Sequence, residues 1–283
     1  MAHRADLVLQ PEYRGLLVVG DIHGHVDLMQ RMMAHAARER LFFVSCGDLV
    51  DRGPSSAHCL LRMRDSVAAG AGAWIRGNHE DKLFRALKGR AVTISGALAA
   101  TLAELDADTA GAEARTWFLA TFESLPFSIR LGSLLVVHGG FGVRMLDLDP
   151  LPAPLRARAL YGQPSRTPRS DGKPVRLYRW VNEIPSGMTV VIGHDPCCDT
   201  CLLERPGQQG GRALHIDSAA GKGGPLSAVE TDRDGTILRA IRMNRESAET
   251  VEIPIRPFSP ELVRVTTGDA AGTDAPDDAS GRD

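Results

Sequence analysis

The sequence has few cysteines, almost no net charge and no long apolar run. Five cysteines, an odd number, in a chain of 283 residues indicate reduced thiols and not a disulfide framework, because a chain of this size folds without crosslinks. A net charge of −2 implies no global basic face for gripping a nucleic-acid backbone. No stretch approaches the length that crosses a bilayer, and the amino terminus lacks an apolar signal core. We therefore expect a cytoplasmic protein with no membrane partner.

What the sequence does contain is enough apolar residues for one substantial core, at 43% of the chain. From Leu16 to Arg76, apolar runs alternate with amphipathic segments, which predicts parallel strands joined by right-handed helical crossovers. We expect a single α/β domain over residues 1–258, with a helical insertion at about residues 81–124. The polar stretch at residues 259–283 predicts a disordered tail.

Further strands are expected after the helical insertion, at residues 127–131, 134–137, 188–192, 213–216 and 251–255. A hairpin of residues 228–230 and 237–241 is expected to close a second sheet. Residues 147–171 are rich in Pro, Arg and Ser and show little periodicity, which predicts a surface loop.

Four of the predicted strands end in polar residues with complementary chemistry. After Leu16–Val19 comes Gly20-Asp21-Ile22-His23-Gly24, where a carboxylate and an imidazole two residues apart face one way. The other three strands are followed by Gly47-Asp48-Leu49-Val50-Asp51-Arg52-Gly53, Gly77-Asn78-His79-Glu80 and His138-Gly139-Gly140. Singly, each motif has a plainer explanation as a turn, a surface ion pair or a core histidine. Jointly they favour one shared site at the carboxyl ends of the strands.

Together with Gly193-His194, these motifs provide a mixed oxygen and nitrogen ligand set: Asp21, His23, Asp48, Asn78, His138 and His194. Hard or borderline divalent ions take such donors, whereas a structural zinc site more often uses thiolates. Asp48 comes from the middle strand and is the natural bridge between two ions. We expect two divalent ions, with Mn²⁺ foremost and iron, zinc or nickel as alternatives.

The remaining motif residues suit phosphoryl transfer. Two metal ions generate a hydroxide near neutral pH and stabilise the phosphoryl oxygens under attack. The planar fork of Arg52 can hold two phosphate oxygens. His79, next to Asn78, is placed to protonate the leaving oxygen, and Asp51 can orient it and favour its charged form.

The order of these motifs resembles the calcineurin-like metallophosphoesterase superfamily, and within it the branch of serine/threonine phosphoprotein phosphatases. The resemblance implies a four-layer α/β/β/α sandwich of two mixed sheets. It also implies that Asp21, His23 and Asp48 hold one metal ion. The second ion would be held by Asp48, Asn78, His138 and His194. Arg52 and Asn78 would then contact phosphate, and Asp51 with His79 would act as the general acid.

A closer resemblance is to the central phosphatase domain of bacterial polynucleotide kinase-phosphatase enzymes, in residues 77–90, 160–162, 172–176, 190–196 and 216–218. In these relatives a late aspartate, here Asp217, lies beside the site. An arginine in the loop before the Gly-His strand can also bind phosphate, and Arg176 and Arg179 are the candidates. The kinase and ligase modules are absent from this sequence.

The leading hypothesis is a phosphatase like the serine/threonine protein phosphatases, in which a metal-bridging hydroxide attacks a phosphomonoester. The alternatives are a symmetrical dinucleoside tetraphosphate hydrolase and a polynucleotide 2′,3′-end phosphatase or phosphodiesterase. The substrate would thus be a phosphoprotein, a nucleotide or a nucleic-acid end. A catalytically silent phosphate-binding module is a different class, and the complete ligand set argues against it. Cys197, Cys198 and Cys201, near His194, are interpreted as plain loop cysteines.

Overall fold

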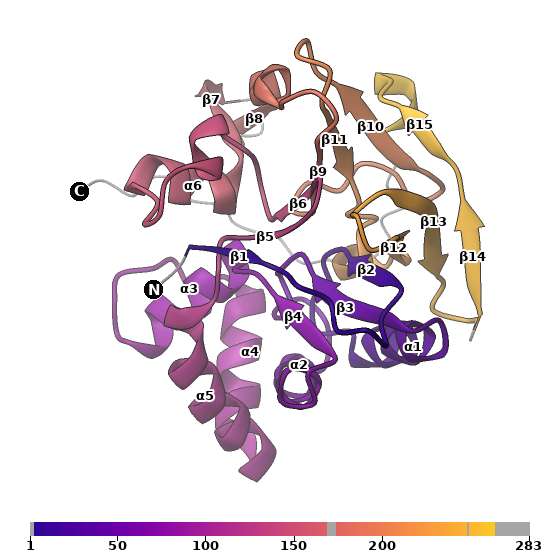
Figure 1. Ribbon diagram of the computed structural model, residues 1–283. Helices are drawn as coiled ribbons and strands as arrows, with labels where there is room; N and C mark the ends of the chain where they lie inside the picture. Colours follow the sequence, from indigo (N-terminus) through magenta and orange to yellow (C-terminus); the bar gives the residue numbers. More distant parts are fainter. Residues whose placement is uncertain (1–2, 169–173, 248, 264–283) are drawn as a thin grey trace.

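The computed structural model describes residues 3–168, 174–247 and 249–263, and its core is a pair of stacked sheets (Figure 1). The six-stranded sheet contains β2 (Gly15–Val19), β3 (Leu41–Ser45), β4 (Gly72–Trp74), β12 (Leu226–Thr231), β13 (Ile237–Met243) and β14 (Thr250–Ile253). The seven-stranded sheet contains β1 (Arg4–Asp6), β5 (Ser128–Leu131), β6 (Leu134–Val137), β9 (Thr189–Ile192), β10 (Leu202–Pro206), β11 (Arg212–His215) and β15 (Ile255–Pro257).

Both sheets mix parallel and antiparallel pairs. Their orders are β14-β13-β12-β2-β3-β4 and β1-β5-β6-β9-β11-β10-β15. Strands β2, β3 and β4 are parallel neighbours, and so are β6, β9 and β11, whereas β12 runs antiparallel to β2. The predicted right-handed α/β region therefore forms one half of the first sheet.

Helices cover both outer faces (Figure 1). The six-stranded sheet is covered by α1 (Val26–Arg38), α2 (Ser56–Ala68), α3 (Asn78–Leu87), α4 (Gly96–Ala107) and α5 (Thr109–Thr121). Helix α6 (Ala153–Tyr161) and the 3-10 segments η2 (Val143–Leu146) and η3 (Arg179–Glu183) pack against the seven-stranded sheet. The four-layer α/β/β/α sandwich of two mixed sheets is confirmed. Within the described ranges, every helix is too short or too polar to cross a bilayer.

Strand β2 shows why the first sheet is buried on both faces. Its side chains alternate, because successive residues of a strand point to opposite sides. Leu17 and Val19 pack beneath the helices, while Leu16 and Val18 face the other sheet. A strand buried on both faces reads as a continuous apolar run, and this run carries the chain to the first motif.

The predicted loop at residues 147–171 is wrong for most of its length. It contains α6 and the strand β7 (Gln163–Pro168), which pairs with β8 (Pro174–Leu177). Helix α6 buries only Ala159 and Leu160 against the sheet, which is too little for a recognisable apolar period.

The prediction that the hairpin of β12 and β13 closes the second sheet is wrong. The hairpin extends the six-stranded sheet, because Ala228 of β12 pairs with Val19 of β2. The predicted strand at residues 251–255 divides into β14 and β15, which belong to different sheets. Sheet membership depends on pairing with a distant strand, and a local sequence pattern carries no information about it.

The predicted disordered tail lies mainly outside the described residues. Its first part is ordered: Pro260–Leu262 forms the 3-10 segment η5. Leu262 packs with Phe258 against a cluster formed by Cys197, Cys198, Cys201 and Leu203. A single apolar side chain in a polar stretch was too weak a signal to predict this contact.

Candidate metal centre

The loops that follow β2, β3, β4, β6 and β9 meet at the carboxyl ends of these strands. They bring together all six predicted ligands in one chain of contacts no longer than 4.0 Å: Asp21, His23, Asp48, Asn78, His138 and His194. Five of these residues are at most 2% exposed, and His194 is partly buried. Residues separated by more than 170 positions in sequence therefore share one cluster.

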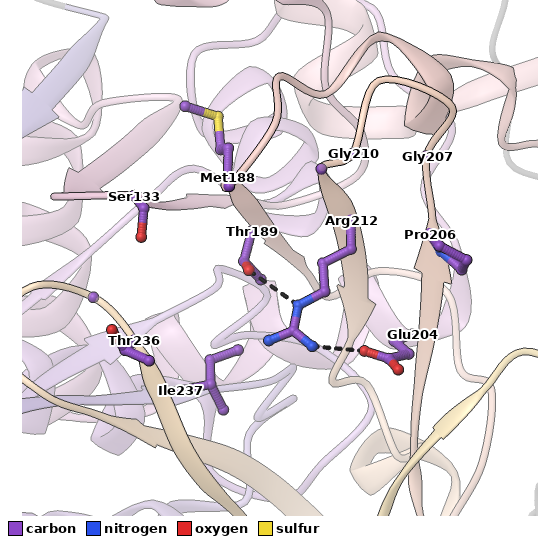
Figure 2. A pocket seen from close by; sticks show the side chains of 13 residues that line it. Ser133, Met188, Thr189, Glu204, Pro206, Gly207, Gly210, Arg212, Thr236 and Ile237 are labelled. Atoms are coloured by element: carbon purple, nitrogen blue, oxygen red, sulfur yellow. Dashed lines mark hydrogen bonds and ion pairs between the residues drawn. The ribbon is translucent and has the colours of Figure 1, made fainter.

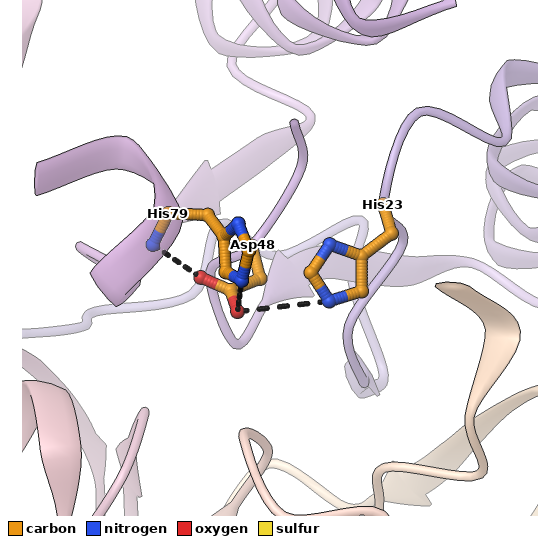
Figure 3. A group of neighbouring side chains, drawn as sticks. All are labelled: His23, Asp48 and His79. Carbon is orange, nitrogen blue, oxygen red and sulfur yellow. Dashed lines mark hydrogen bonds and ion pairs between the residues drawn. The ribbon is translucent and has the colours of Figure 1, made fainter. Parts of the chain in front are cut away.

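Asp48 lies between two groups of donors and faces each with a different oxygen. Its Oδ2 is 3.7 Å from Nε2 of His23 and 3.9 Å from Nε2 of His79. Figure 3 shows how these three side chains lie. Oδ1 of Asp48 is 3.4 Å from Nε2 of His138. A carboxylate that presents its two oxygens to two donor groups has the geometry needed to bridge two ions.

Backbone oxygens fix the orientation of two of the histidine rings. Nδ1 of His23 is 2.9 Å from the Val50 oxygen, and Nδ1 of His138 is 2.8 Å from the Cys46 oxygen. Since a carbonyl oxygen only accepts, each ring must donate from Nδ1. In the neutral ring, the lone pair of Nε2 then points into the cluster, which is the tautomer that a metal ligand requires.

The charges of the cluster are strongly coupled. Burial alone would raise the pKa of Asp48, but His138 and His79 outweigh it and hold that pKa well below its ordinary value. Burial acts against the charged form of His138, yet Asp48 raises its pKa to about 10. Burial and then the Asp217 carboxylate raise the pKa of Asp21 well above its usual range. Two buried carboxylates such as Asp21 and Asp217 can both be ionised only if a nearby cation compensates their charge.

Two glycines leave room for the ligand carboxylates. A Cβ on Gly77 would lie 2.1 Å from Oδ1 of Asp48, and a Cβ on Gly193 would lie 2.1 Å from Oδ1 of Asp21. Any larger residue would displace a carboxylate, so the glycines of these motifs are required by close approach.

The site also concentrates backbone strain. Seven non-glycine residues in the described part of the chain have a left-handed φ, and five of them, with φ from 49° to 70°, are predicted site residues: His23, Asp48, Asp51, Arg52 and His194. Such conformations cost about 1–3 kcal/mol each, and they persist where the side chain is needed.

Arg52, Asp51 and His79 lie on the rim of the ligand cluster. The Arg52 guanidinium spans two rings, with Nη1 at 2.9 Å from Nε2 of His23 and Nη2 at 3.3 Å from Nε2 of His79. Oδ2 of Asp51 is 2.6 Å from Nδ1 of His79. Asp51 and His79 therefore pair as predicted, and the other ring nitrogen, Nε2, lies 3.9 Å from Oδ2 of Asp48 in the cluster.

Comparison with known proteins agrees with this geometry. The profile of the family described as calcineurin-like phosphoesterase matches residues 15–203, more than half of the chain. The chain belongs to this family. It is accordingly a metal-dependent phosphoester hydrolase.

The curated relatives with similar sequences include bis(5′-nucleosyl)-tetraphosphatases named PrpE [asymmetrical]. That of Bacillus velezensis is 28% identical over 78% of this chain and 90% of its own length. That of Bacillus thuringiensis is 29% identical over 87% of this chain and 97% of its own length.

Among solved structures, a candidate diadenosine tetraphosphatase superposes with a TM-score of 0.54 and 22% identity, covering 87% of this chain and all of that one. A protein serine/threonine phosphatase from Saccharomyces cerevisiae gives a TM-score of 0.50 with 15% identity, covering 89% of this chain and 82% of that one. At these identities the two structures show the shared fold alone.

Calcineurin-like phosphoesterases use a binuclear divalent metal centre, and the donors of this phosphoesterase fit one. Two groups have ligand atoms within 4.8 Å of one another: His23 with Asp48 and His79, and Asp48 with His138 and His194. Nδ2 of Asn78 and Nε2 of His194 are buried without a hydrogen-bond partner in the described structure. Since buried polar atoms are rarely left unpaired, these orphaned atoms also indicate a place for a polar ligand.

Glu80 of the phosphoesterase has a role at the site that the sequence analysis does not predict. Glu80 is fully buried, and its carboxylate accepts hydrogen bonds from the N–H groups of Asp48 at 2.8 Å, Leu49 at 2.7 Å and Gly77 at 3.0 Å. Burial and the nearby Asp48 raise the pKa of Glu80 to about 7. Its place at the end of Gly77-Asn78-His79-Glu80 was the available signal, because it lies one helical turn from Gly77.

Of the three remaining predicted site residues, Asp217 and Arg176 lie beside the cluster and Arg179 is exposed. Asp217 is buried, and burial raises its pKa to about 6. Nη1 of Arg176 donates to the Tyr161 oxygen at 2.6 Å, and the charge of Arg176 is close enough to lower the pKa of His194, after burial and His138. Arg179 lies on η3 with an exposed side chain. Asp217 and Arg176 thus border the cluster.

The three loop cysteines are buried and free. Sγ of Cys198 lies 3.1 Å from Sγ of Cys201, and Sγ of Cys197 lies 3.4 Å from Nδ1 of His215. Their other neighbours include Leu203, Phe258 and Leu262. They pack as small apolar side chains behind the loop that carries His194.

A hollow of about 460 Å³ lies at the other end of the strands, where β9 and β11 begin. Figure 2 shows Arg212 in its wall, with Nη1 at 2.7 Å from Oε2 of Glu204 and Nε donating to Oγ1 of Thr189 at 3.1 Å. None of the predicted site residues lines this hollow.

Proposed function

We propose that this phosphoesterase hydrolyses dinucleoside tetraphosphates, and that it cleaves them asymmetrically. Relatives at 28–29% identity, matched over about nine-tenths or more of their length, carry this activity in their names. The protein serine/threonine phosphatase shares only the fold, at 15% identity. The hypothesis of a phosphoprotein substrate therefore becomes secondary to one of its alternatives, with asymmetrical in place of symmetrical cleavage.

The position of Asp48 between two donor groups carries the hydrolytic part of the proposal, while the choice of substrate rests on the relatives. In this proposal Asp21, His23 and Asp48 would hold one ion, and Asp48, Asn78, His138 and His194 would hold the other. When bound, the ions supply a nucleophile at neutral pH and neutralise the charge of the phosphoryl oxygens. Asp217 supports the first ion through its closeness to Asp21, as the raised pKa of Asp21 indicates.

Arg52 orients the phosphoryl group in this proposal. Its guanidinium is planar, and its two Nη atoms already span the rings of His23 and His79. The same fork can donate to two oxygens of one phosphate. Asn78 and Arg176 add donors near the second ion, whereas the exposed Arg179 is the weakest candidate for a phosphate contact.

His79 delivers the proton to the leaving oxygen. Its Nδ1 is held by Asp51 at 2.6 Å, which fixes the tautomer and turns Nε2 towards the cluster. Proton transfer by a positioned side chain typically contributes about 10²–10⁴-fold to the rate.

The test uses the full chain, stripped of metal and resupplied with Mn²⁺. We expect diadenosine tetraphosphate to be converted to ATP and AMP faster than a phosphoserine peptide or an RNA 2′,3′-cyclic phosphate is hydrolysed. Formation of two ADP would refute asymmetrical cleavage. Faster hydrolysis of the phosphopeptide would restore the protein-phosphatase hypothesis, and a protein with no activity and no bound metal would be the silent module.

A further inference from the structure

The helical insertion contacts the proposed general acid through one buried hydroxyl. Thr101 lies on α4 and is 2% exposed. Its Oγ1 donates to Oδ1 of Asp51 at 2.7 Å, while Oδ2 of the same carboxylate accepts from Nδ1 of His79 at 2.6 Å. Each carboxylate oxygen thus has a partner, and the rotation of the Asp51 carboxylate is fixed from both sides.

The direction of these hydrogen bonds follows from the chemistry of the groups. The N–H of Asp51 donates to Oγ of Ser56 at 3.0 Å, and Oγ of Ser56 is 3.1 Å from Oγ1 of Thr101. The Asp51 carboxylate only accepts, so the Thr101 hydroxyl donates to it and the Ser56 hydroxyl donates to Thr101. The three bonds form a closed ring that begins and ends on Asp51.

The ring holds a residue that needs support. Asp51 has a left-handed φ of 70°, and its side chain is almost fully buried. Helix α4 makes a second contact three residues later, at the start of α2, which follows the loop that carries Asp51. There the carboxylate of Glu104 accepts from the N–H groups of Ser56 at 2.8 Å and Ala57 at 2.9 Å. Asp51 and the helix that follows its loop are therefore bound to α4 at two points one helical turn apart.

We propose that Thr101 is a positioning residue for proton transfer to the leaving group. By fixing Asp51, its hydroxyl keeps Nε2 of His79 aimed at the reacting phosphate. This inference rests on the proposed role of His79 as the general acid. It assigns to the insertion a part in the chemistry, in addition to its packing over the sheet.

The experiment compares two aryl phosphates with the Mn²⁺-loaded full chain. Nitrophenolate leaves readily without a proton, whereas phenolate is a stronger base and depends more on the acid. We expect Thr101→Val, which keeps the shape but removes the hydroxyl, to lower kcat for phenyl phosphate by about tenfold or more. The kcat for p-nitrophenyl phosphate should fall by less than about threefold, as expected for a better leaving group.

Three variants act as controls. Thr101→Ser keeps the hydroxyl and should retain the wild-type ratio of the two rates. Thr116→Val, on the exposed part of α5, removes a helical threonine hydroxyl remote from the site and should change neither rate. His79→Ala should show the largest leaving-group dependence. If it shows none, the proposed acid role of His79 is wrong; if it does and Thr101→Val does not, only the role of Thr101 is wrong.

An NMR measurement tests the same proposal without turnover, so it does not depend on how fast a substrate reacts. The proton between Nδ1 of His79 and Oδ2 of Asp51 should give a downfield NMR resonance that is absent from His79→Ala. We expect this resonance to shift or broaden in Thr101→Val, and in Thr101→Ala should the valine variant fail to fold. It should persist in Thr101→Ser. An unchanged resonance in the variants without a hydroxyl, or an equal loss of activity on both substrates, would overturn the proposal.

Discussion

The two ends of the strands differ in character: one carries a hollow and the other carries the cluster of metal ligands. The hollow beside Arg212 has a volume of about 460 Å³, which is enough for a small ligand. Its charges are already paired, and its left-handed positions, Gly187, Gly210 and Gly235, are all glycines. At the metal centre, left-handed backbone falls on residues with functional side chains, such as Asp48, and buried polar atoms lack partners in the described structure.

This difference distinguishes a mere cavity from a functional site. Glycine adopts left-handed backbone at no steric cost, and it can occupy these positions of the hollow because no side chain is needed there. At the metal centre a glycine would remove a ligand, and the strain is retained. Convergent donors and buried polar atoms without partners in the described structure therefore identify the functional end of the sheet better than cavity volume does.

The largest expected effect comes from removing the shared ligand. Asp48→Asn should lower hydrolysis of diadenosine tetraphosphate by about a thousandfold or more, since both donor groups lose the same charge. The bound metal, measured by mass spectrometry, should fall with it. Arg212→Gln, which removes the charge of one partner of a half-exposed ion pair at the hollow, should keep activity within about twofold of the wild type. Equal losses of activity in the two variants would show that the metal centre and the hollow do not differ in function.

The second test adds metal and follows unfolding. Mn²⁺ at about 100 times its dissociation constant should stabilise the folded wild type by about 2.7 kcal/mol. A corresponding rise in Tm is expected in the wild type and not in Asp48→Asn. The same rise in both proteins would place the stabilising ion elsewhere.

A third test compares two glycines. In Gly193→Ala the new Cβ would lie 2.1 Å from Oδ1 of Asp21, so we expect the affinity for Mn²⁺ to fall by about tenfold or more. Gly187→Ala has open space but a φ of 75°, so it should cost about 1–2 kcal/mol in the free energy of unfolding and leave metal affinity unchanged. Metal titration and urea denaturation measure the two quantities.

The smallest effect is expected at the hollow itself. Glu204→Gln weakens an ion pair whose side chains are 26% and 40% exposed, for Glu204 and Arg212. Exposed pairs contribute about 0–1 kcal/mol, so the free energy of unfolding should change by less than about 1 kcal/mol, and less still in high salt. A larger loss, or any loss of activity, would give the hollow a role that its geometry does not indicate.

The sequence predicted the strands that carry the motifs, because these strands are buried on both faces and read as apolar runs. Asp21 and Asp48 follow β2 and β3, which are parallel neighbours in one sheet, and His138 follows β6 of the sheet stacked on it. The candidate ligands could therefore be located at the strand ends without knowing the full order of strands in either sheet.

The parts that were missed depend on contacts across the fold. Helix α6 buries two residues, so its sequence lacks an apolar period. The pairing of β12 with β2 joins residues more than 200 positions apart. Thr101 lies on an ordinary helix, and only the structure shows that its hydroxyl meets Asp51. Apolar patterns in the sequence indicate which residues are buried, but they do not indicate which residues far apart in the sequence are in contact.

The first turn of α3 limits how the chain can vary in length. Within four consecutive residues, Gly77 leaves room for Asp48, Asn78 and His79 face the centre, and Glu80 binds the preceding loop. Each helical residue rotates the next by about 100°, so a single inserted residue would turn three of these groups away from their partners. Homologues should therefore tolerate substitutions near this turn more readily than insertions or deletions within it.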